Sequence, residues 1–148
     1  MVKESNPWIE ASDVILMFST LIWKIQLKAE LRKAMDVKML MLVERMRQEE
    51  PELMHSQGWQ SDQTLHERED FRDLVACVNK AARSALRFLR MGYDAFEITG
   101  CWANVLAKGT AHRPHHHPNN FLSGVYYVRT QPGADTINFH DPRNQTGI

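Results

Sequence analysis

The sequence has little cysteine, no excess of either charge and no long uninterrupted apolar segment. Its two cysteines, Cys77 and Cys101, lack CxxC spacing and cannot form a disulfide framework. Eighteen basic residues balance eighteen acidic ones, so no net field attracts nucleic acid or an anionic membrane. The longest apolar stretch, Val14 to Trp23, is interrupted by Ser19 and Thr20, and no secretory signal precedes it. We therefore expect a cytoplasmic protein that binds neither nucleic acid nor membranes.

The length and the apolar content set the domain organisation. A chain of 148 residues with 43% hydrophobic residues can bury one core but is too short for two ordinary domains. We predict a single domain over residues 1–148, with a helical part over about residues 28–92 and a sheet part over about residues 93–148.

A helix is predicted from about Lys28 to Glu50, where Pro51 ends it. The apolar residues of this segment recur at spacings of four, four, three and four: Leu31, Met35, Met39, Leu42 and Met46. The methionines are expected to pack against the sheet. Residues 51–63 lack periodicity and are predicted to be a loop, in which Trp59 caps the helices rather than contacting substrate.

A second helix is predicted to begin at a capping box formed by Thr64 and Glu67 and to end after Arg90, with Gly92 at its C-cap. Its apolar positions are expected on one face: Phe71, Leu74, Val78, Ala81, Ala85 and Leu89.

The remaining apolar segments favour strands. Strands are predicted at Val14–Leu27, Phe96–Leu106, Phe121–Thr130 and Thr136–Phe139, with a turn at Gln131–Gly133. Trp102 and Tyr126 are interpreted as core residues, whereas the amide of Asn104, on an alternating face, could line a pocket. Helices followed by strands indicate an α+β domain with the helices on one sheet face.

Histidines are concentrated at the start of the third strand segment. In extended backbone, His115 and His117 point to one face while His116 turns away, which is the arrangement of a metal chelate. One residue of the Tyr126-Tyr127 pair must face the same side. The alternative is a solvated histidine loop with adventitious metal affinity. His112 is interpreted as a loop residue, and His55 and His66 as surface histidines.

Several short motifs, in this order, resemble the 2-oxoglutarate and Fe(II)-dependent oxygenases of the prolyl-hydroxylase-like group. They are Gly58-Trp59-Gln60-Ser61, Trp102-Ala103-Asn104, the His-x-His-Pro of His115 to Pro118, Ser123-Gly124-Val125-Tyr126-Tyr127, and Phe139 through Asp141-Pro142-Arg143. The resemblance implies a double-stranded β-helix, or jelly roll, on which the N-terminal helices pack. It implies Fe(II) and 2-oxoglutarate as cofactors, His115 and His117 as metal ligands, and Tyr127 as a cosubstrate contact, with Asn104 shaping the pocket.

The sequence departs from the wider superfamily in two respects. His117 stands where a carboxylate is usual, which removes a negative charge from the facial triad. The distal histidine and the arginine for 2-oxoglutarate would follow Ile148, so we expect a jelly roll that is incomplete at the C-terminus. His140 is a less favoured candidate for the third ligand, and Arg143 is interpreted as a turn or substrate-side residue.

Two functions follow from this pattern. The first is a dioxygenase that hydroxylates a small-molecule or peptide substrate whose identity the sequence does not reveal. The second is a truncated, inactive oxygenase-like fragment or subunit that acts by protein interaction. An open sheet edge would support such pairing, including homo-oligomers.

Overall fold

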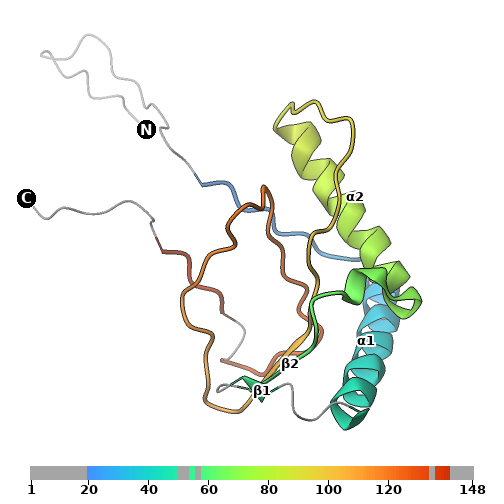
Figure 1. The fold of residues 1–148 in the computed structure, drawn as a ribbon, viewed down its shortest axis with the longest axis vertical. Helices are drawn as coiled ribbons and strands as arrows, with labels where there is room; N and C mark the ends of the chain where they lie inside the picture. The colour runs from blue at the N-terminus through green and yellow to red at the C-terminus, as the bar shows by residue number, and fades with distance from the viewer. Residues whose placement is uncertain (1–19, 50–53, 56–57, 134–135, 141–148) are drawn as a thin grey trace, which may run out of the picture.

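The computed structural model of the protein describes residues 20–49, 54–55, 58–133 and 136–140. The two helices lie on one side of the molecule, and the strands and the long extended segments of the C-terminal half lie on the other (Figure 1). The elements in chain order are α1 (Ala29–Glu49), β1 (Met54–His55), β2 (Gly58–Gln60), the 3₁₀ turns η1 (Leu65–Glu67) and η2 (Glu69–Phe71), α2 (Arg72–Phe88) and β3 (Asn104–Leu106).

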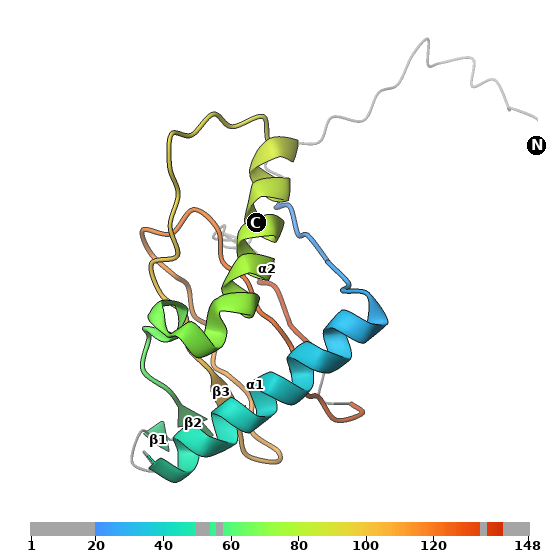
Figure 2. The same cartoon turned by 90° about the vertical axis from the view of Figure 1, so that its right-hand side faces the viewer.

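Helix α1 forms over nearly the predicted range and buries the predicted methionine stripe. Met39, which is only 1% exposed, and its neighbours at helical spacing form the centre of the core. Leu31, assigned to the same stripe, is instead 51% exposed. The strands lie near the C-terminal end of α1, so its first turns have no sheet to cover them (Figure 2).

The sheet has three antiparallel strands in the order β1-β2-β3. Trp59 pairs with Val105 in the register of β2 and β3 and is 5% exposed within the methionine core. Gly58 is required beside it, because a Cβ atom there would lie 2.3 Å from the carbonyl oxygen of Val105. The predicted loop over residues 51–63 is therefore wrong at 54–55 and 58–60, which form β1 and β2. The sequence around Trp59 did not reveal this, because β2 pairs with β3, which follows more than forty residues later.

Helix α2 begins and ends differently from its prediction. The side chain of Thr64 makes no capping hydrogen bond, and the turns η1 and η2 precede the helix in place of a capping box. At the other end the left-handed residue is Arg90, with φ 53°, rather than Gly92. The amides of Arg90 and Met91 donate to the carbonyl oxygens of Arg87 and Leu86 in a Schellman motif.

Ion pairs between side chains join α1 to η2 and to the start of α2. Lys38 pairs with Asp73 and Arg45 with Asp70, each with a nitrogen–oxygen distance of 2.7 Å. Because both pairs are solvent-exposed, water and salt screen them, and each contributes little to stability. The buried apolar cluster accounts for most of the packing.

The other predicted strands are absent from the described residues. Residues 20–27, 121–130 and 136–139 have no regular structure, and Phe96–Leu106 contributes only β3 and an isolated bridge from Cys101 to Thr64. Residues 14–19 of the first predicted strand lie outside the described part. The turn at residues 131–133 is confirmed, with Gly133 at φ 79°. A segment of residues that favour strands forms a strand only when another strand pairs with it.

The α+β class is therefore confirmed, whereas the jelly roll is not seen: the sheet of the described residues has three short strands. Neither described helix combines the length and the apolar character that a membrane span requires.

Candidate functional site

The histidine-rich segment follows β3 through a turn. The amide of Thr110 donates to the carbonyl oxygen of Ala107 at 3.1 Å, and Gly109 adopts the left-handed conformation, with φ 80°. Beyond this turn, residues 111–120 are exposed except for His117, which is half-buried.

His115 and His117 lie side by side, as their spacing predicts. Their ring centroids are 5.0 Å apart and the ring planes are nearly perpendicular. His116 makes no ring contact within the described residues and is exposed. Extended backbone explains this difference, because alternate side chains point to opposite faces.

The hydrogen bonding of His115 selects its tautomer. Its Nδ1 atom lies 2.8 Å from the backbone carbonyl oxygen of Arg113. A carbonyl oxygen only accepts, so Nδ1 carries the proton and donates, which leaves the lone pair on Nε2. Metal-binding histidines in proteins are commonly oriented by such a second hydrogen bond. His115 is thus prepared to ligate through Nε2.

Two further rings extend the pair into a row. The indole of Trp102 lies against His117, with centroids 5.4 Å apart, and the ring of His112 lies 5.6 Å from that of His115. Trp102 was interpreted from the sequence as a core residue; it is half-buried and also forms a wall beside the histidines.

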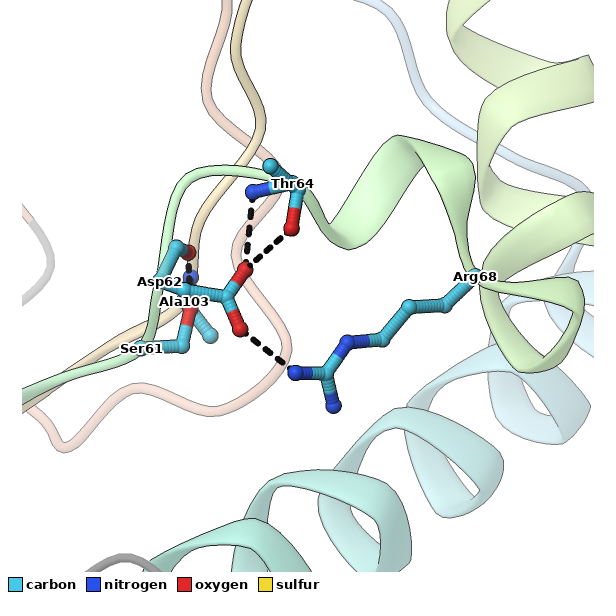
Figure 3. A network of polar contacts seen from close by, with 5 residues as sticks. All are labelled: Ser61, Asp62, Thr64, Arg68 and Ala103. Carbon is cyan, nitrogen blue, oxygen red and sulfur yellow. Dashed lines mark hydrogen bonds and ion pairs between the residues drawn. The ribbon is translucent and has the colours of Figure 1, made fainter.

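The segment that carries Trp102 is held by Ser61 (Figure 3). The hydroxyl of Ser61 accepts from the amide of Ala103 at 2.9 Å and donates to the carbonyl oxygen of Asp62 at 2.7 Å. The amide of Ser61 in turn donates to the carbonyl oxygen of Ala103 at 3.0 Å. Ser61 is the one buried polar residue in the described core, and it fixes the backbone next to Trp102.

Asp62 organises the turn that leads from this contact into η1 (Figure 3). Its Oδ1 atom accepts from both the amide and the hydroxyl of Thr64 at 2.8 Å, and its Oδ2 atom pairs with Arg68. The hydrogen bond from the Thr64 amide and the charge of Arg68 hold the pKa of Asp62 below its ordinary value, against a smaller opposing effect of burial. Asp62 therefore has a structural role, in which its ionised carboxylate accepts the hydrogen bonds that hold this turn.

The two adjacent tyrosines point in different directions. The hydroxyl of Tyr126 donates to Oδ1 of Asp36 on α1 at 2.7 Å, and its ring packs on the core, as predicted. Burial, together with the carboxylate of Asp36, raises the pKa of Tyr126 well above its usual range. Tyr127 is exposed, so it is the tyrosine left free to face another group.

Asn104 lies on β3 opposite Gln60, and its side chain is exposed rather than buried on the alternating face. The roles predicted for Asn104 and Tyr127 as cosubstrate contacts stay predictions, as do the ligand roles of His115 and His117.

The two predicted iron ligands can be compared with the ligand set of a facial Fe(II) site. Facial sites of this class use two histidines and a carboxylate, and the His115–His117 pair suits two of those positions. Within the described part of the chain no three histidine, cysteine, aspartate or glutamate side chains are grouped closely enough to hold a metal ion together. His140, considered as a third ligand, is exposed and belongs to no such group.

One histidine differs from its sequence interpretation. His66 in η1 was taken as a surface residue, but its side chain is only 17% exposed and its Nδ1 atom is buried without a hydrogen-bond partner. Its Nε2 atom lies 3.9 Å from a carboxylate oxygen of Glu67. No local sequence signal distinguishes it, because the packing of η1 against the core creates the burial.

Comparison with known families agrees with the motifs. The family model described as "Putative 2OG-Fe(II) oxygenase" matches residues 100–148, a stretch that includes Trp102, His115 and His117. No curated protein and no solved structure shows significant similarity to the chain. The resemblance seen in the motifs is therefore confirmed for residues 100–148, which are similar to the 2OG-Fe(II) oxygenase family.

Proposed function

We propose that this chain is a single oxygenase-like domain of a 2-oxoglutarate- and Fe(II)-dependent dioxygenase that hydroxylates a small-molecule or peptide substrate. The observation that supports it most directly is the His115–His117 pair, with the Nδ1 atom of His115 engaged by Arg113, inside the segment that matches the family. The family implies Fe(II) and 2-oxoglutarate, and the bound metal would supply oxygen activation coupled to decarboxylation of the cosubstrate.

In this scheme the residues of the chain have distinct tasks. His115 and His117 hold the metal on neighbouring positions, and the hydrogen bond to Arg113 keeps Nε2 of His115 directed outward. Trp102 excludes water from one side of His117. Tyr126 is hydrogen-bonded to Asp36 on α1, and the adjacent Tyr127 is exposed. In this scheme Tyr127 orients 2-oxoglutarate, and Asn104 shapes the pocket.

A titration with Mn(II) or Co(II) tests the ligand assignment. His115→Ala and His117→Ala should each lower the affinity at least about tenfold, the loss typical even for second-layer partners of metal sites. His116→Ala is the matched control, because this residue is exposed in the same segment and makes no ring contact. It should bind as the wild type does.

The cosubstrate gives a second measurement. 2-Oxoglutarate should bind only when the metal is present, and Tyr127→Phe should weaken that binding without changing the affinity for the metal. Equal losses for all three histidine variants would indicate a flexible histidine run, and metal-independent binding of 2-oxoglutarate would argue against an oxygenase site.

A further inference from the structure

The C-terminal half of α2 carries positive charges without negative ones. Its basic residues recur at spacings of three, four and three, so the first three share one side of the helix and the last follows in the turn that ends it: Lys80, Arg83, Arg87 and Arg90. All four are exposed. Although the chain as a whole is neutral, no aspartate or glutamate occurs between Asp73 and Asp94. We call these four residues the basic stripe.

The basic stripe differs from the other basic residues of the two helices because it has no acidic partner. Three ion pairs involve α1 or the start of α2: Lys38–Asp73, Arg45–Asp70 and Arg72–Glu69. Within the part of the chain that the structure describes, no ion pair engages the basic stripe. The helix dipole favours Arg87 and Arg90, but its effect is confined to the last turn and does not explain Lys80 and Arg83.

Aromatic side chains lie beside the basic stripe. The guanidinium of Arg83 lies over the ring of Phe96, 5.7 Å from its centroid, and the ring of Tyr93 stands edge-on to that of Phe96. Phe88, at the end of α2, is 67% exposed and contacts the ring of Trp23, with centroids 5.7 Å apart. Stacking on a ring orients a guanidinium without occupying its N–H donors, so less conformational entropy is lost when it binds an anion.

The extent of the basic stripe limits the kind of partner. From Lys80 to Arg90 the chain rises about 15 Å, a length that an extended peptide covers with about five residues. The positive charge does not continue toward the other end of α2, because residues 62–73 contain five acidic and two basic residues. Nucleic acids and anionic bilayers gain affinity from many cationic contacts over a long or wide surface, which this surface does not provide.

We infer that the basic stripe and the exposed rings of Phe88 and Tyr93 form a docking surface for a short acidic peptide segment of a partner protein. The segment carries both carboxylate and apolar side chains. Its carboxylates pair with Arg83 and Arg87, since a guanidinium matches the geometry of a carboxylate, and its apolar side chains contact Phe88. The surface uses no metal and no histidine, so this inference goes beyond the proposed function and does not depend on it.

Fluorescence anisotropy of the full chain with a labelled peptide of about eight residues, built from glutamate and leucine, tests this surface. Arg83→Gln and Arg87→Gln should each weaken binding about two- to fivefold, and the double variant about tenfold. Lys108→Gln is the matched control, because it removes the same charge from an exposed residue in the turn that follows β3. The strands lie at the opposite end of the molecule from the end of α2 (Figure 2), so this variant should bind as the wild type does.

Two properties of the binding separate it from adventitious contact. The affinity should fall as the salt concentration rises, because the pairs are exposed and screened. The same peptide with glutamine in place of glutamate should bind at least about tenfold more weakly, since it lacks the charges that pair with the stripe. Because the substituted residues are exposed, far-ultraviolet circular dichroism should be identical for the wild type and the variants.

The remaining outcomes would overturn the inference. No binding of the acidic peptide by the wild type, or an equal loss in Lys108→Gln, would show that the stripe is not a docking surface. Tighter binding of single-stranded DNA or of vesicles containing phosphatidylserine, with the same dependence on Arg83 and Arg87, would assign the surface to a different class of partner. Self-association in sedimentation velocity that the double variant abolishes would assign it to a second copy of the chain.

Discussion

The hydrogen bond from Tyr126 to Asp36 should measurably stabilise the fold. It connects the family-matched segment to α1 across 90 residues of sequence, with an oxygen–oxygen distance of 2.7 Å. Hydrogen bonds to charged groups contribute about 1.5–3 kcal/mol, but Asp36 is only half-buried and water can replace part of the interaction. We therefore expect Tyr126→Phe, which keeps the ring packing, to lower the free energy of unfolding by about 1 kcal/mol.

A double-mutant cycle with Asp36→Ala isolates this interaction. Urea denaturation of the four proteins should give a coupling energy of about 1 kcal/mol, and Tyr126→Phe should lower the melting temperature by about 2–4 °C for a chain of this size. If the two substitutions are additive within about 0.3 kcal/mol, Tyr126 does not fasten this segment to α1.

The pKa of Tyr126 adds a second measurement. Because burial and Asp36 raise this pKa above its ordinary value of 10.0, the folded state keeps its proton where the unfolded state loses it. The contribution to stability is complete below pH 10 and declines as the pH rises above it. Between pH 9 and pH 11 the wild type should therefore lose more stability than Tyr126→Phe, and parallel curves would contradict the raised pKa.

Three further predictions concern the core, the turn and the surface. Met39→Ala should lower the free energy of unfolding by about 2–5 kcal/mol, whereas Met41→Ala, at a position 69% exposed, should change it by less than about 0.5 kcal/mol; similar effects in urea denaturation would mean that α1 faces the core differently. The lowered pKa of Asp62 contributes stability above its ordinary value of 3.8, so the difference between wild type and Asp62→Ala should shrink as the pH falls from 6 to 3; a constant difference would argue against an ionised acceptor. The exposed Phe121 and Val125 predict self-association in sedimentation velocity at micromolar concentration, reduced when both are changed to serine; a wild-type monomer would contradict this.

The helices were the most predictable part of the fold. The apolar period located α1 within one residue at each end and identified four of its buried residues, because helical hydrogen bonds and side-chain spacing are local. The ends of α2 were less predictable, since Asp62 rather than Thr64 organises its approach and Arg90 rather than Gly92 adopts the left-handed conformation. Helix ends depend on whichever neighbouring groups reach the free amides and carbonyls.

The strands and the candidate site were less predictable from the sequence than the helices. The residue types favoured strands at 121–130 and 136–139, but no partner pairs with them in the described part, while the apparent loop around Trp59 pairs with β3. For the site, the two-residue spacing placed His115 beside His117, but it could not show that Trp102 closes one end of the row and His112 the other.

The sequence by itself determined the two helices, the α+β class, the similarity of residues 100–148 to the oxygenase family and the adjacency of the two histidines, because each depends on spacing along the chain or on a linear motif. Only the tertiary structure decided which strands pair, that Ser61 holds Ala103, and that Tyr126 turns to Asp36 and leaves Tyr127 exposed. The two side-chain hydrogen bonds join residues that are 42 and 90 positions apart. Their formation depends on packing and hydrogen bonding between distant segments, which no local pattern encodes.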